Sequence, residues 1–147
     1  MLPKVYVGMP ITFAEDHVGL FRRVADAMEG FLEPVLPADA EETFRWSLDI
    51  ESELLDKVCS AMVSRDIRRL EGSDGALFFM PRPSIGVAME MVYAVNFGLP
   101  TLVVVPVSLL YHPWLRCHAT KIVWSTDMFG RDLPHLVKLM RDLMNQT

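Results

Sequence analysis

The sequence predicts a single α/β domain in which helices cover both faces of a parallel sheet. Five short runs of apolar and β-branched residues alternate with longer stretches whose apolar residues recur at helical spacing. The run Thr101 to Val105 is almost continuously apolar, as expected of a strand buried on both faces. A chain of 147 residues can bury one sizeable core, so we expect residues 1–147 to form one domain.

The predicted strands are bounded by residues that end regular structure. The first follows the N-terminus almost at once and leads into the turn Gly8 to Thr12, and the second lies between Gly30 and Pro37. The third begins after Gly75, and the fourth follows Pro100. The expected strands cover residues 4–7, 33–36, 76–80, 101–105 and 121–124.

Helical spacing of apolar residues predicts helices over residues 15–31, 52–70, 85–97 and 133–144. The helix over 52–70 has a candidate break near Ser60. The helix over 85–97 has Ser84 as its N-cap and is expected to be buried nearly all round, because its residues are largely apolar. Residues 37–50 and 106–120 show no clear period and are expected to be loops or irregular segments.

Strands that alternate with helices in this way predict a flavodoxin/Rossmann-like three-layer sandwich with a five-stranded parallel sheet in the order 2-1-3-4-5. In such sheets, ligands bind beyond the carboxyl ends of the strands at the switch point, here between the first and third strands. The loops Gly8 to Thr12 and Pro81 to Gly86 would meet there. Glu90 lies one turn further along the following helix and is expected to face the same crevice.

Composition excludes several classes of partner. The net charge is −5 and the Lys and Arg residues are dispersed, which argues against a nucleic-acid polymer. No apolar run is long enough to span a bilayer, and the early first strand leaves no room for a signal peptide, so we expect a cytoplasmic protein. Cys59 and Cys117 are too few for a disulfide framework or a zinc site. We expect neither a metal nor a cofactor.

The start of the helix after the third strand combines two chemical features. Ser84 and the free N–H groups of Ile85, Gly86 and Val87 favour a phosphate or another anion, and Gly86 lets a ligand approach closely. Glu90 is the one carboxylate on this apolar helix, and a buried carboxylate is costly unless it is paired or used. A structural role for Glu90 is the simpler interpretation. Together the two features indicate a phosphorylated substrate with an electrophilic carbon that Glu90 attacks.

The motifs of the chain resemble those of a known family. Val5-Tyr6 leads into Gly8-Met9-Pro10-Ile11, Arg65-Asp66-Ile67 precedes Ser73-Asp74, and Pro83-Ser84-Ile85-Gly86-Val87-Ala88-Met89-Glu90 is followed by Tyr93-Ala94 and Gly98-Leu99-Pro100. In these blocks, from Val5 to about Val105, the chain resembles the nucleoside 2-deoxyribosyltransferase superfamily and, within it, the 2′-deoxynucleoside 5′-monophosphate N-hydrolases.

The resemblance implies roles for the matched residues. Glu90 would be the nucleophile at C1′, and Asp66 would be the partner carboxylate that helps to protonate the departing base. Tyr6 would orient Glu90 or the sugar. Glu90 should then be ionised and Asp66 protonated, with the carboxyl groups roughly 5–7 Å apart, near the range of retaining glycosidases.

The remaining roles concern substrate binding. Ile11 would line the sugar pocket near Gly8, while Ser84 and Gly86 would hold the 5′-phosphate. In these hydrolases a serine of a neighbouring subunit also reaches the phosphate; the nearest candidate is Ser108, with His112 and Arg116 as alternatives. We therefore expect a homodimer in which the loop 106–118 lies near a neighbouring site.

The expected reaction is hydrolysis of the N-glycosidic bond of a nucleoside 5′-monophosphate, with either ribose or deoxyribose. Three alternatives stay open: a deoxyribosyltransferase that passes the sugar to a second base, an N-glycosidase specific for CMP or a modified CMP, and a nucleotide-sensing module in which Glu90 only binds a ribose hydroxyl. A flavin-binding flavodoxin is disfavoured because the first loop has a single hydroxyl residue, Thr12.

Overall fold

The fold is an α/β sandwich around a five-stranded, all-parallel sheet in the order β2-β1-β3-β4-β5, which confirms the predicted order. The computed structural model of the chain describes residues 1–10, 17–37 and 52–146. The strands are β1 (Lys4–Gly8), β2 (Glu33–Val35), β3 (Gly75–Phe79), β4 (Thr101–Val105) and β5 (Lys121–Trp124).

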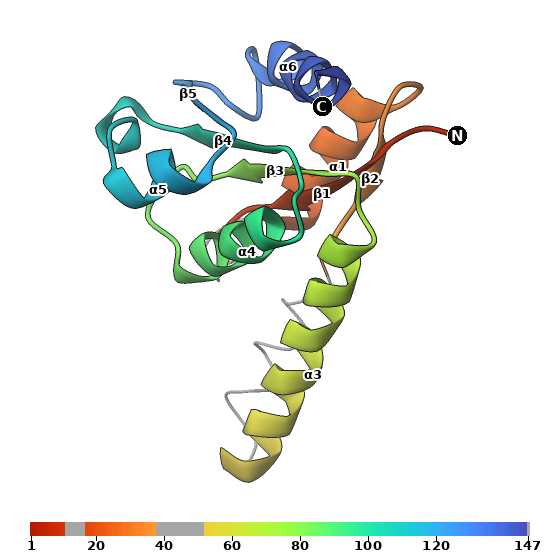
Figure 1. Cartoon of the computed structure of the whole chain (residues 1–147), viewed down its shortest axis with the longest axis vertical. Coiled ribbons are helices and arrows are strands. Elements are labelled where there is room, and N and C mark those ends of the chain that lie inside the picture. Colours follow the sequence, from red (N-terminus) through yellow and green to blue (C-terminus); the bar gives the residue numbers. More distant parts are fainter. Residues whose placement is uncertain (11–16, 38–51, 147) are drawn as a thin grey trace.

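Helices lie on both sides of this sheet (Figure 1). On one side lie α1 (His17–Met28) and α6 (Leu133–Asn145), and on the other lie α4 (Ile85–Asn96) and α5 (Pro113–His118). The long helix α3 (Ser52–Glu71) joins the side of α4 through its C-terminal end, and its N-terminal part extends away from the sheet (Figure 1). A 3₁₀ turn, η1 (Val107–Leu109), follows β4.

Alternation along the strands divides the core into two layers. In β1, Val5 and Val7 pack in the layer formed with α1 and α6, whereas Tyr6 packs in the layer formed with α4. In β3, Phe79 belongs to the first layer and Phe78 to the second. In the layer beneath α4, the neighbouring strands β1 and β3 therefore contribute the aromatic residues Tyr6 and Phe78.

Several segments differ from the expectations. The helix α3 continues past Ser60 without a break, because isolated polar residues do not interrupt a helix. The segment predicted as a loop over 106–120 contains η1 and α5, and α5 begins at Pro113, a residue favoured in the first turn. Residues 38–50 of the other predicted loop lie outside the described residues.

The expectation that α4 is buried nearly all round is wrong. Only Val87, Met91 and Ala94 are buried, whereas Ile85 is 80% and Met89 63% exposed. The physical reason is that the sheet covers one face of the helix, and the described residues leave most of the outer face uncovered. Across the described ranges, no helix has the length and apolar character needed to cross a membrane.

Candidate active site

A cavity of about 310 Å³ opens at the predicted switch point of the sheet. It lies between α3, α4 and the residue that follows β1, so it brings together segments that are far apart in the sequence. Its polar lining is Asp66, Ser84, Glu90 and Tyr93. The rest of the wall is Met9, Met62, Val63, Ile67, Leu70, Gly86, Val87 and Met89. The site thus combines two carboxylates with an apolar, methionine-rich wall.

Glu90 projects from the second turn of α4 towards the end of β1. A Cβ placed on Gly8 would lie 3.5 Å from Glu90 Oε2 and only 2.4 Å from Cδ1 of Phe78. A glycine is therefore required at position 8, where the strand passes beneath the carboxylate. Glu90 Oε2 is inaccessible to solvent and has no hydrogen-bond partner among the described residues.

Burial raises the pKa of Glu90 from its ordinary value of 4.5 to about 7. The neighbouring Tyr6 hydroxyl acts in the opposite direction, and the negative charge of Asp66 adds to the rise. A carboxyl group with a pKa near 7 can hold or release a proton at neutral pH. Such a group in a cavity is a candidate for catalysis rather than a feature of a stable core.

Tyr6 lies beneath the two carboxylates. Its side chain is fully buried, and burial together with the charges of Glu90 and Asp66 raises the pKa of its hydroxyl, which therefore stays protonated. The hydroxyl is close enough to Glu90 to favour the ionised carboxylate, although its geometry falls short of a full hydrogen bond. The predicted orienting role of Tyr6 fits this placement.

Asp66 lies near the end of α3, one turn before Arg69. Its side chain is 14% exposed, and Arg69 Nη1 lies 3.9 Å from Asp66 Oδ1. A guanidinium at this distance favours the ionised form of the aspartate. With a pKa of about 7, Glu90 can hold a proton in the ligand-free protein at neutral pH, whereas the attack expected of it requires the ionised carboxylate.

The N-terminus of α4 forms one end of the cavity. Ser84 is extended, with φ −142° and ψ 123°, and its hydroxyl accepts a hydrogen bond from Val87 N–H at 3.3 Å, which confirms the predicted N-cap. A Cβ placed on Gly86 would meet no atom of the described residues within 4 Å. The space over this helix end is therefore open, and the helix dipole favours an anion there.

Two predicted site residues remain. Ser108 is exposed on η1 and does not line it, and Ile11 lies outside the described residues. The separation of the two carboxyl groups stays a prediction. Sequence reasoning did not identify Arg69 as the partner of Asp66, although an acid and a base three residues apart on a helix are a known signal for such a pair.

Known proteins support the fold and nothing finer. No protein family and no curated protein sequence matches the chain. A conserved protein from Enterococcus faecalis V583 is similar in structure, with a TM-score of 0.58 and 15% identity, over 95% of this chain and 99% of that one. The flavoenzyme NAD(P)H:(acceptor) oxidoreductase FerB from Paracoccus denitrificans has a TM-score of 0.55 and 15% identity, over 99% and 98% of the two chains.

A third solved structure, the CMP N-glycosidase BcmB from Clostridium botulinum, has a TM-score of 0.49 and 15% identity, over 92% of this chain and 96% of that one. A score of this size supports no argument about function. The similarities to the proteins of Enterococcus faecalis V583 and Paracoccus denitrificans show that the α/β fold occurs in known structures. What this site does must therefore be argued from its own residues.

Proposed function

We propose that this chain is an N-glycosidase that hydrolyses the N-glycosidic bond of nucleoside 5′-monophosphates, releasing a free base and a sugar 5-phosphate. The observation that carries the proposal is the placement of Asp66 and Glu90 in one cavity that ends at the N-terminus of α4. Two carboxylates suit glycoside cleavage, and a helix N-terminus suits a phosphate. The apolar wall suits the faces of a sugar and a base.

In the first step, Glu90 attacks C1′ and forms a glycosyl ester while the C1′–N bond breaks. The base leaves with a proton delivered by Asp66, so the pair must reach the state in which Glu90 is ionised and Asp66 protonated. Since a pKa of about 7 lets Glu90 hold a proton in the ligand-free protein, that proton has to leave Glu90 when the substrate binds, and Asp66 of the same cavity is its proposed acceptor. The Tyr6 hydroxyl favours the ionised form of Glu90.

In the second step, water attacks C1′ and the bond between C1′ and the Glu90 oxygen breaks. Asp66, which lost its proton to the base, accepts a proton from the attacking water, and Glu90 leaves as a carboxylate. The pair then again holds one proton, as it did before the first step. This is the two-step logic of retaining glycosidases applied to a nucleotide.

The mechanism predicts the direction of the pH dependence. The active state has one proton on the pair, and this proton is lost as the pH rises through about 7, the pKa of Glu90. kcat/KM should therefore fall above pH 7. If kcat/KM instead rises through pH 7, loss of the Glu90 proton activates the enzyme. That result would contradict a mechanism in which Glu90 and Asp66 share one proton.

The direct test is incubation with ribo- and deoxyribonucleoside 5′-monophosphates and with the matching nucleosides, followed by chromatography of the free base. The monophosphates should be cleaved and Glu90→Gln should release no base. Base release by Glu90→Gln at the wild-type rate would refute the nucleophile. Exchange of the base with an added second base, instead of hydrolysis, would favour the transferase, and binding without base release would favour the sensing module.

Two variants at the helix end separate binding from folding. Gly86→Ala should fold normally, because its Cβ has free space and alanine favours helix, but it should weaken monophosphate turnover by narrowing the approach to the helix end. Ser84→Asp should weaken monophosphate turnover strongly and nucleoside turnover little, because a carboxylate repels a phosphate. If Ser84→Asp leaves the preference for monophosphates over nucleosides unchanged, the phosphate does not bind at this helix end.

A further inference from the structure

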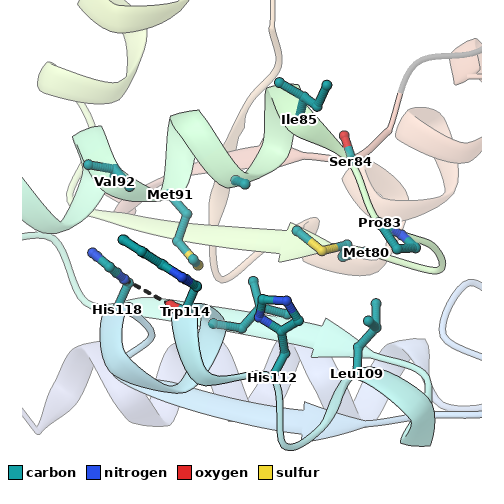
Figure 2. A pocket seen from close by; sticks show the side chains of 12 residues that line it. Met80, Pro83, Ser84, Ile85, Met91, Val92, Leu109, His112, Trp114 and His118 are labelled. Carbon is teal, nitrogen blue, oxygen red and sulfur yellow. Dashed lines mark hydrogen bonds between the residues drawn. The ribbon is translucent and has the colours of Figure 1, made fainter.

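A second cavity, of about 400 Å³, lies on the opposite side of α4 from the candidate active site. It is a groove between α4 and the segment formed by η1 and α5 (Figure 2). Met80, Met91 and Leu115 form its buried wall, and Trp114 and His118 lie opposite α4. The groove is as large as a typical small-molecule site, and the proposed reaction does not use it.

Ser84 lines both cavities, so the groove and the active site meet at the N-terminus of α4. Figure 2 shows Ser84 and Ile85 at one end of the groove, with Pro83 and Met80 beside them. The phosphate of the proposed substrate would sit at this shared end, over the open space at Gly86. A group attached to the far side of the phosphate would then point away from Glu90 and towards the groove.

The side chains of the groove indicate what that group is. Trp114 is 69% exposed, and its ring lies parallel to that of His118, with centroids 5.8 Å apart and an interplanar angle of 7°. The His118 ring is held by a hydrogen bond of 2.8 Å from Nδ1 to the carbonyl oxygen of Trp114. A carbonyl can only accept, so Nδ1 carries hydrogen and Nε2 is left to contact a ligand. A fixed aromatic surface of this kind suits a planar ring.

The charges of the two cavities also differ. The active-site cavity is lined by Asp66 and Glu90, whereas the described residues of the groove include no carboxylate and two imidazoles, His112 and His118. A phosphate at the shared end would therefore meet no acidic side chain from the groove. The groove is compatible with the anionic linkage and with an uncharged aromatic group beyond it.

We infer that the enzyme accepts nucleoside 5′-phosphates whose phosphate is esterified to a planar aromatic group, with the nucleoside in the active site and the aromatic group in the groove of α4 and α5. The inference rests on the proposed function and extends its substrate class from monoesters to aryl diesters of phosphate. The bond broken is still the C1′–N bond, so the aryl phosphate leaves attached to the sugar.

The experiment compares the best-cleaved monophosphate of the panel with its 1-naphthyl phosphodiester. In the wild type, kcat/KM for the diester should be higher by about tenfold, as expected for one aromatic stacking contact. Trp114→Ala should remove this gain and leave the monophosphate unchanged. Tyr111→Ala is the matched control, because Tyr111 is an exposed aromatic residue of the same segment that does not line the groove; it should change neither value.

Ala88→Phe, which places a ring inside the groove from α4, should also remove the gain and does not depend on the stability of α5. Cleavage of the monophosphate without any gain for the diester would overturn the inference and leave the proposed function intact. Absence of base release from both substrates would overturn both. Conversion of a dimer to a monomer by Trp114→Ala would show that a second copy occupies the groove, and would also overturn the inference.

Discussion

Replacement of Glu90 by glutamine should make the protein more stable as the pH rises, relative to the wild type. The glutamate is buried, and its pKa rises from 4.5 to about 7 in the folded protein. Between these two pH values, the Glu90 carboxyl group therefore binds a proton to a greater extent in the folded state than in the unfolded state. The contribution of the neutral side chain is complete below pH 4.5 and is lost as the pH rises to about 7. Glutamine does not titrate, so it has no such loss.

The magnitude follows from the two pKa values. Each tenfold change in proton affinity corresponds to about 1.4 kcal/mol, so the displacement from 4.5 to about 7 corresponds to about 3 kcal/mol. The free energy of unfolding of Glu90→Gln minus that of the wild type should thus increase by about this amount between pH 4.5 and pH 8. At a urea m value of about 1–3 kcal/mol/M, the difference between the two midpoints should change by about 1–3 M.

The assay is urea unfolding of both proteins at several pH values in this range, with Glu29→Gln as the control. Glu29 is exposed, so Glu29→Gln controls for the loss of one carboxylate at the protein surface. Parallel curves for Glu90→Gln and the wild type would refute the reasoning, because they would mean that Glu90 is not buried as a neutral group. A pH-dependent gain in stability together with loss of turnover would indicate a residue kept for function at the expense of stability.

Three further predictions concern Asp66, Gly8 and the outer face of α4. Asp66→Asn should lower kcat by about 100-fold or more, as loss of a general acid does, and retain substrate binding; unchanged single-turnover rates would remove Asp66 from the chemistry. Gly8→Ala should lower the free energy of unfolding by about 1–3 kcal/mol, because its Cβ would lie 2.4 Å from Phe78 Cδ1. The double variant Gly8→Ala/Phe78→Leu should recover part of this loss, as measured by denaturation. Light scattering at micromolar concentration should give a homodimer, because the outer face of α4 exposes apolar residues such as Met89 and Tyr93; a monomer would contradict this.

Local signals in the sequence were sufficient for the sheet. The strands β4 and β5 have the predicted bounds, because each is a continuous run of residues that favour strands, ended by proline or polar residues. The N-cap at Ser84 was also predictable, since capping depends on a few neighbouring residues. These features require no knowledge of which segments meet in space.

Features that depend on contacts across the fold could not be predicted in the same way. An apolar helix was expected to be buried, but the described residues cover mainly one face of α4, and nothing in the local sequence shows which side chains remain exposed. The close approach of the Phe78 ring to Gly8 involves two different strands. The cavity wall likewise includes Met9, Met62 and Met89, which come from three separate segments. The groove of α4 and α5 depends on a helix within residues 106–120, a segment that the sequence predicts to be a loop.

The protonation state of Glu90 is where the expectation from the sequence and the structure differ most. The proposed chemistry requires a charged Glu90, yet burial raises the pKa of this residue to about 7. At and below this pH the free protein can keep Glu90 neutral and so avoid the cost of a buried charge. The charged form is then needed only when a sugar carbon that gains positive charge lies beside it. If Glu90 is the nucleophile that we propose, its charged form is stabilised by the transition state rather than by the resting protein, which is the condition for selective catalysis.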